Sequence, residues 1–203
     1  MLLFAIAFGY LCGSIPFGLL LARRAGVDVR RVGSGNIGAT NVARSTSNRL
    51  GLATLALDAA KGAVPVALAR WLANDQVAAC AGLAAFLGHV FPLYLRFSGG
   101  KGVATALGVL LGLSAWLALA ALAVFAVVLL ACRYVSAASV AAGIAAAAVA
   151  LVLFGWTEYG IAVIAIVALV IWRHRANVQR LRSGTEHKIF ATRDALPPTD
   201  SAG

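Results

Sequence analysis

The most restrictive feature of this sequence is the segment from Gly102 to Cys132, 31 residues without one charged side chain. As a single α-helix it would extend about 46 Å, whereas the hydrocarbon core of a bilayer is about 30 Å thick. Two shorter spans that turn at Ser114-Ala115-Trp116 fit a bilayer better. They also return Arg133 to the side of the membrane that carries most other cations. We therefore predict two transmembrane helices in this segment.

Five other apolar segments approach or reach the length of a membrane span. They cover residues 1–22, 50–72, 77–95, 135–154 and 159–172. The chain is 62% hydrophobic and only 12% charged, whereas about a quarter of the residues in a soluble domain are charged. These features predict an all-α, polytopic membrane helix bundle with seven transmembrane helices. The fourth and seventh spans are the shortest, and a re-entrant path is the alternative for both.

The distribution of positive charge predicts the orientation of the bundle. Of the 17 Lys and Arg residues, all but Lys61 and Arg70 fall in segments on one side of the predicted membrane. We therefore expect the N-terminus outside and the C-terminus in the cytoplasm. The first span is not read as a signal peptide, because its arginines follow the apolar stretch instead of preceding it. The net charge of +10 does not indicate nucleic-acid binding, because the basic residues alternate with the spans.

The three cysteines, Cys12, Cys80 and Cys132, each stand alone in an apolar run. An odd number of cysteines without ligand spacing argues against a disulfide framework and against a zinc site. We interpret them as small buried hydrophobic residues and predict no metal site.

Two ionisable residues, Asp58 and Lys61, lie within the second span. They are three residues apart, so they share a helix face and can pair. Ionisable residues inside a span are costly and by default suggest function, and a structural ion pair is an equally weighted alternative. His89, near the end of the third span, is interpreted as an interhelical hydrogen-bond donor.

The most polar stretch of the chain is residues 33–44. Its three glycines permit tight turns and let a ligand approach the backbone, and Arg44 offers a guanidinium suited to phosphate. The short hydrogen-bonding side chains are those of Ser34, Asn36, Thr40 and Asn41. Taken alone, this stretch favours the interpretation as an ordinary polar loop over that as a binding site.

Two further polar segments follow transmembrane spans. Residues 96–102 contain Ser98-Gly99-Gly100-Lys101-Gly102, which lacks Walker A spacing but places backbone N–H groups and a lysine just before a helix. Residues 173–188 contain His174 and Asn177, three residues apart and so on one face of a continuing helix. A positive anchor without chemistry is the alternative for this last segment.

The polar segments 23–49, 96–102 and 173–188 all fall on the predicted cytoplasmic side. Together they indicate an anionic, phosphate-bearing substrate at the lipid interface. Charge and topology alone do not separate an enzyme from a transporter, or from a scaffold that anchors partners through its basic face.

Six motifs occur in order along the chain, namely Gly13–Gly18, Ser34–Arg44, Asp58–Gly62, Gly88–Pro92, Phe97–Thr105 and His174–Asn177. The series resembles the bacterial PlsY family, the integral-membrane acyl-phosphate:glycerol-3-phosphate acyltransferases. The resemblance extends to about Lys188. The one departure is Ile37, where family members often have proline, and it affects the stiffness of the loop and not the chemistry.

The resemblance implies a seven-helix enzyme of the bacterial cytoplasmic (inner) membrane, with its active site facing the cytoplasm. Such an enzyme transfers a long acyl chain from acyl phosphate to the sn-1 hydroxyl of glycerol-3-phosphate. It releases lysophosphatidic acid and inorganic phosphate in the first step of phospholipid biosynthesis. The resemblance also implies no metal or other cofactor, and neither acyl-CoA nor acyl carrier protein as the direct donor. We expect one domain over residues 1–188, a disordered tail over residues 189–203, and a monomer.

The predicted catalytic residues are Ser34, Arg44, Lys101, His174 and Asn177, and the predicted substrate-binding residues are Asn36, Thr40, Asn41, Gly99, Gly100 and Gly102. Arg44 and Lys101 are expected to clamp phosphates, while the three glycines offer N–H groups to the donor phosphate. Asn177 is expected to contact the attacking hydroxyl or the developing oxyanion, and His174 to position a phosphate. We expect Glu186 to hold a basic residue in a salt bridge instead of acting as a base.

The sequence contains no nucleophile elbow and no His-x4-Asp pair, and no His or Lys lies near Ser34 in sequence to activate it. The resemblance therefore favours direct attack by the substrate hydroxyl, with a substrate phosphate accepting the proton. The alternative function is a transporter or flippase for a phosphorylated metabolite or lipid. That class usually shows inverted repeats, and we find none in the sequence.

Overall fold

The computed structural model describes residues 1–189, and this part of the chain is helical apart from its loops. The predicted tail, residues 189–203, lies outside the described residues except for Ile189. The elements are α1 (Leu2–Ser14), α2 (Phe17–Arg24), α3 (Ala39–Ser45), α4 (Asn48–Leu72), α5 (Asp75–Val90), η1 (Leu93–Leu95), α6 (Val103–Leu113), α7 (Ala115–Cys132), α8 (Val135–Phe154), α9 (Glu158–Arg173) and α10 (Arg175–Arg182).

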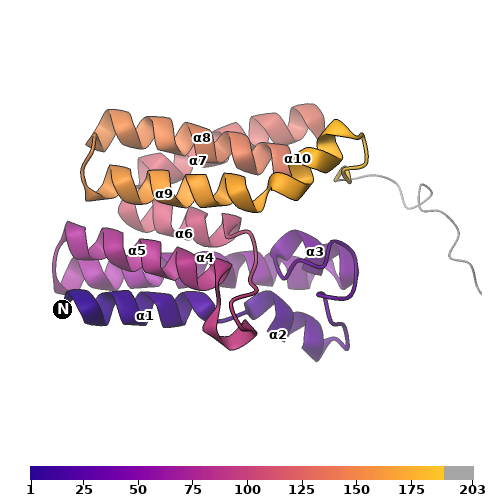
Figure 1. Cartoon of the computed structure of the whole chain (residues 1–203), viewed down its shortest axis with the longest axis horizontal. Coiled ribbons are helices and arrows are strands. Elements are labelled where there is room, and N and C mark those ends of the chain that lie inside the picture. Colours follow the sequence, from indigo (N-terminus) through magenta and orange to yellow (C-terminus); the bar gives the residue numbers. More distant parts are fainter. Residues whose placement is uncertain (190–203) are drawn as a thin grey trace, which may run out of the picture.

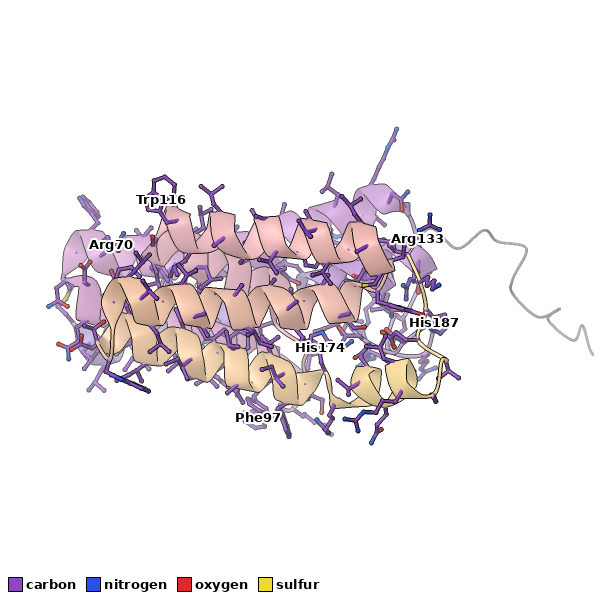
Figure 2. All side chains as sticks on the ribbon, turned by 90° about the horizontal axis from the view of Figure 1, so that it is seen from above. Arg70, Phe97, Trp116, Arg133, His174 and His187 are labelled. Atoms are coloured by element: carbon purple, nitrogen blue, oxygen red, sulfur yellow. The ribbon has the colours of Figure 1, made fainter. Side chains whose placement is uncertain are left out.

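The long helices lie side by side along the long axis of the molecule, and α2, α3 and α10 gather at the end away from the N-terminus (Figure 1). The predicted turn between the fourth and fifth apolar segments is confirmed, because α6 ends at Leu113 and α7 begins at Ala115. Trp116 and Arg133, near the two ends of α7, accordingly lie at opposite ends of the bundle (Figure 2).

Five helical segments of the described chain are long and apolar enough to cross a membrane. They are Leu2–Arg24, Asn48–Leu72, Asp75–Leu95, Ala115–Cys132 and Val135–Phe154. Helices α9 and α10 form a sixth if the pair, bent by 49°, is one span. The predicted fourth span corresponds to α6, whose 11 residues extend about 16 Å. The chain is therefore a multi-pass membrane protein, and α6 is an apolar helix shorter than the five candidate spans of the described residues.

Close backbone contacts hold the N-terminal half of the bundle together. A Cβ atom on Gly13 of α1 would lie 1.9 Å from the Ala85 carbonyl oxygen of α5, and one on Gly108 of α6 would lie 1.8 Å from the Ala59 carbonyl oxygen of α4. Small residues at helix contacts give the van der Waals packing that holds helices together in lipid, where the hydrophobic effect contributes little. These contacts fix α4 and α6 beside each other, at the base of the polar loops.

A buried ion pair joins three parts of the bundle. Lys61 Nζ lies 2.8 Å from Asp58 Oδ1, as the spacing predicts, and both side chains are at most 3% exposed. The same ammonium donates to the carbonyl of Ile15, at the break between α1 and α2, at 2.7 Å. His89 Nδ1 of α5 lies 3.9 Å from Asp58 Oδ1. The pair therefore ties α4 to the α1–α2 break and lies beside α5.

We expect the Lys61→Met variant to be strongly destabilised, because it leaves the Asp58 carboxylate buried without a cation. Losing one partner of a buried pair typically costs about 3–5 kcal/mol. The double variant Asp58→Asn/Lys61→Met removes both charges and should unfold at a higher temperature than Lys61→Met in detergent. The exposed Arg49→Met serves as the matched control. A double variant no more stable than Lys61→Met would contradict this account.

Candidate active site

The three predicted polar segments meet in one cleft of about 400 Å3 at the end of the bundle that holds α3 and α10. Nine of the predicted site residues line this cleft: Ser34, Asn36, Thr40, Asn41, Arg44, Lys101, Gly102, His174 and Asn177. Gly99 and Gly100 are the two that do not line it. The prediction that these segments form a common site from distant parts of the chain therefore agrees with the geometry.

Asn41 organises the first loop. Its side-chain amide donates to the carbonyls of Val29 and Asn36, both at 2.9 Å, and its Oδ1 accepts from the N–H of Ser34 at 3.0 Å. The side chain is buried, and its hydrogen-bonding atoms are engaged within the loop. The structure thus corrects the expectation that Asn41 orients substrate directly, because this side chain instead shapes the backbone that presents Ser34.

The glycine loop has a different role from the one predicted. The N–H groups of Gly99 and Gly100 donate to the carbonyls of Val90 and His89, each at 3.2 Å. Their own carbonyls accept from Arg173, at 2.6 Å for Gly99 and 3.1 Å for Gly100. The prediction that these two amides bind the donor phosphate is therefore wrong for this structure, because both are already used inside the protein.

Glycine is nevertheless required at these positions by close packing. A Cβ atom on Gly100 would lie 2.3 Å from His89 Nε2. Gly102 adopts a φ of +81°, a conformation that favours glycine, and forms the N-cap of α6. The loop thus packs on α5 and turns sharply into α6, and Lys101 directly precedes the Gly102 N-cap of α6.

The cleft contains two cations without partners. Within residues 1–189, neither Arg44, on the last turn of α3, nor Lys101 forms a hydrogen bond or an ion pair, and both line the cleft. Burial is the main cause that lowers the pKa of the Lys101 ammonium from 10.5 to about 8, and Glu186 opposes the shift. Two unpaired cations facing one cleft form a site for an anion with a high charge density.

The third segment contributes His174 and Asn177 to the lining of the cleft. His174, at the break between α9 and α10, hydrogen-bonds through Nδ1 to the Val170 carbonyl at 2.8 Å. Because a carbonyl only accepts, Nδ1 carries the proton, and Nε2 remains for a ligand. Asn177 Nδ2 donates to Glu186 Oε1 at 2.6 Å, while Asn177 Oδ1 is buried and has no partner within residues 1–189.

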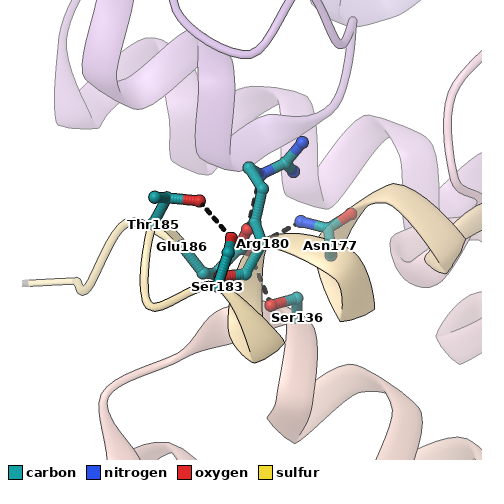
Figure 3. Close-up of polar contacts among 6 residues, drawn as sticks. All are labelled: Ser136, Asn177, Arg180, Ser183, Thr185 and Glu186. Atoms are coloured by element: carbon teal, nitrogen blue, oxygen red, sulfur yellow. Dashed lines mark hydrogen bonds and ion pairs between the residues drawn. The ribbon is translucent and has the colours of Figure 1, made fainter.

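Glu186 orients Asn177 as part of a small network (Figure 3). Its carboxylate also accepts from Ser136 Oγ at 2.7 Å and from Arg180 Nε at 2.7 Å. Burial alone would raise the pKa of Glu186, but the hydrogen bonds from Ser136, Asn177 and Arg180 lower it below its usual value. The prediction that Glu186 holds a basic residue in a salt bridge is confirmed by its contact with Arg180.

Sequence reasoning missed several residues that build the site. Ser136, Arg180 and His187 line the cleft, and Arg173 supports the glycine loop from α9. A usable signal existed for two of them, because Arg173, Asn177 and Arg180 follow the i, i+4, i+7 spacing of one helix face. Nothing local to Ser136 indicated its contact with Glu186, 50 residues away.

The cleft opens into an apolar groove of about 620 Å3 that lies among α3, α4 and α6–α9. Thr40, Arg44, Val103 and Phe125 line both spaces, so the cleft and the groove are continuous. An anion site next to a lipophilic groove suits an amphiphile with a phosphate head and an apolar chain.

Residues 3–184 match the family model described as "Glycerol-3-phosphate acyltransferase". The chain belongs to this family. It is 53% identical over 182 residues to the glycerol-3-phosphate acyltransferase of Geotalea daltonii, covering 88% of this chain and 92% of that protein. A second relative, from Geobacter sulfurreducens, is 51% identical over 189 residues and covers 91% and 96% of the two chains.

Two solved structures of PlsY, an integral membrane glycerol 3-phosphate acyltransferase, share this fold. The glycerol 3-phosphate form is 43% identical with a TM-score of 0.90, and the lysophosphatidic acid form is 42% identical with a TM-score of 0.87. Each match covers 93% of this chain and 95% of the solved chain. The resemblance to the PlsY family is therefore confirmed, and the chain is a membrane acyltransferase.

The shifted pKa of Lys101 predicts how activity of this acyltransferase depends on pH. Lys101 is charged below its pKa, so raising the pH through about 8 removes the cation from the free enzyme. We expect kcat/KM for glycerol-3-phosphate to fall above this value, approaching tenfold per pH unit, because kcat/KM reports groups of the free enzyme. The substrate phosphate has a second pKa near about 6 and does not titrate in this range. A fall with the same midpoint in Lys101→Arg would contradict the assignment.

Glu186→Gln should lower kcat about tenfold or more while changing KM for glycerol-3-phosphate less. The substitution removes the negative charge and one of the two acceptor oxygens, so a single amide oxygen remains for Ser136, Asn177 and Arg180, and the Asn177 amide is held less firmly. Glu158→Gln, exposed at the opposite end of α9, is the matched control. If the variant instead unfolds at a lower temperature and its lower activity does not come mainly from kcat, Glu186 has a purely structural role.

Proposed function

We propose that this acyltransferase uses acyl phosphate as its donor and the sn-1 hydroxyl of glycerol-3-phosphate as its acceptor, giving lysophosphatidic acid and inorganic phosphate. The observation that carries the proposal is the pair of cations that line the cleft without a partner among residues 1–189, Arg44 and Lys101. Arg44 also lines the apolar groove. The forms in which the related PlsY was solved, with glycerol 3-phosphate and with lysophosphatidic acid, support the acceptor and the product.

The make-up of the cleft supports a donor that is already activated. Acyl phosphate is a mixed anhydride with a good leaving group, so the protein needs to supply positioning and charge stabilisation. Among residues 1–189, the Ser34 hydroxyl makes no hydrogen bond to a histidine or lysine, the partner that an activated serine nucleophile needs. Direct transfer between the two substrates therefore fits the residues present.

In the proposed reaction, the hydroxyl oxygen of glycerol-3-phosphate attacks the acyl carbonyl carbon and forms the ester bond. The bond between that carbon and the phosphate oxygen breaks, and the departing phosphate takes the hydroxyl proton. Arg44 and Lys101 stabilise the phosphates and the charge that develops between them. Asn177 Oδ1 accepts a hydrogen bond from the attacking hydroxyl, and His174 Nε2 with Ser34, Asn36 and Thr40 orients glycerol-3-phosphate. The N–H of Gly102, at the start of α6, is the remaining glycine donor for phosphate.

We further propose seven membrane crossings, with the N-terminus outside and the cleft at the cytoplasmic face of the bacterial inner membrane. Helices α2, α3 and α10 gather at one end of the bundle (Figure 1). Basic residues concentrate in and around these helices, and residues of α3 and α10 line the cleft, which supports this orientation. Residues 1–188 would form one acyltransferase domain that acts as a monomer.

The test is phosphate release by the purified protein in detergent, with palmitoyl phosphate as donor, with and without glycerol-3-phosphate. We expect release that depends on glycerol-3-phosphate and yields lysophosphatidic acid, and none with palmitoyl-CoA. Turnover with palmitoyl-CoA alone would keep the acyltransferase but reject the proposed donor, and no turnover with either would favour transport.

Arg44→Ala should lower turnover in this assay by two or more orders of magnitude, because it removes one of the two cations that stabilise the departing phosphate and the charge that develops during acyl transfer. Arg24→Ala, exposed on α2 and outside the cleft, should retain wild-type rates. Near-normal rates in a folded Arg44→Ala variant would reject the clamp.

A further inference from the structure

We propose that the closed end of the apolar groove sets the longest acyl chain that the enzyme uses efficiently. The inference rests on the proposed function, since it assigns the chain of the acyl donor to this groove. It adds the residues that determine chain length: Ala146, whose small side chain leaves space at the end of the groove, and four buried residues one helical turn beyond it.

The groove follows one stripe of α8 from the cleft into the bundle. Its α8 lining residues are Val135, Ser139, Ala142, Gly143 and Ala146, which recur at helical spacing. Val135 also lines the cleft, so this end is where the phosphate of an amphiphile would lie. From Val135 to Ala146 the helix rises about 16 Å, and this distance defines the depth available to a chain.

The neighbouring helices α6, α7 and α9 also line the groove over only part of their length. The last lining residue is Leu110 on α6, Ala121 on α7 and Ile166 on α9. Each of these three side chains is at most 6% exposed. The inner end of the groove is therefore enclosed by buried side chains.

One helical turn deeper, the same faces carry buried residues that do not line the groove. They are Leu113 on α6, Leu117 on α7, Ala150 on α8 and Val163 on α9, all at most 2% exposed and part of one buried cluster. We call these four residues the plug. Because a packed interior has few voids, a chain longer than the groove must displace the plug or leave through the side.

The groove also has a side opening, and the alternative to the proposal is that the acyl chain leaves through it into the bilayer. Leu52 and Leu55 of α4 and Leu122 of α7 line the groove and are also exposed on the surface of the bundle. A chain that left between α4 and α7 would lie in the bilayer and would not sense the plug. The plug reading is favoured because the α8 stripe leads from the cleft to the enclosed end, but the two paths predict opposite results for one substitution.

The substitution is Ala146→Phe, measured as kcat/KM for saturated acyl phosphates from 10 to 18 carbons with glycerol-3-phosphate fixed. We expect short chains to keep near-wild-type values and the optimum to shift to shorter chains. Each methylene that loses its apolar contact should cost about fourfold in kcat/KM, so the ratio of short-chain to long-chain activity rises at least tenfold. Ala148→Phe, on the exposed face of α8, is the matched control and should leave the profile unchanged.

Leu117→Ala is the second variant, and it opens the plug instead of filling the groove. We expect it to shift the optimum toward longer chains, which keeps the proposal testable if Ala146→Phe does not fold. The proposal would be overturned in favour of the lateral path if kcat/KM depended on chain length in Ala146→Phe as it does in the wild type. The same holds if both variants lost kcat/KM by the same factor at every chain length. Failure of wild-type protein to use any acyl phosphate would instead reject the proposed donor.

Discussion

A cation inside a membrane protein is stable only when it is paired or placed where water or an anion reaches it, and this constraint determines where each charge of the bundle lies. Lys61 is fully buried and bonded to Asp58 and to the Ile15 carbonyl. Lys101 is held half-buried in a cleft with no partner among the described residues. The first arrangement stabilises the fold, whereas the second leaves unsatisfied charge that a substrate phosphate can neutralise.

Arg44 and Lys101 depend on a second set of residues whose side chains are hydrogen-bonded within the protein. Asn41 fixes the loop before α3, Arg173 holds the glycine loop by its carbonyls, and Glu186 orients the Asn177 amide. Preorganised polar groups need little rearrangement when charge develops during a reaction, which makes them effective in catalysis. Residues bonded within the protein therefore hold in place Arg44 and Lys101, the cations of the cleft that have no partner among the described residues.

Whether a predicted residue lines the cleft with an available group depends on whether that group is already bonded within the protein. Arg44, Lys101 and Asn177 were predicted as site residues, and all three line the cleft. Among residues 1–189, the charges of Arg44 and Lys101 have no partner, and neither does the buried Asn177 Oδ1. Gly99 and Gly100 were predicted as phosphate donors because they precede a helix, but their amides bond to His89 and Val90 on α5. A local motif shows which groups are able to bind a ligand, but it does not show which of them are already bound to another part of the protein.

The sequence by itself determined the apolar helices, the break at Ser114, the gathering of cations on one side and the pairing of Asp58 with Lys61. Each of these depends on hydropathy, charge or helical spacing within a short segment. Only the tertiary structure decided which polar groups are satisfied, how deep the apolar groove extends, and which residues close it. The reason is that these contacts join distant segments, such as Arg173 with Gly99 across 74 residues and Ser136 with Glu186 across 50, and no local pattern specifies a partner so far along the chain.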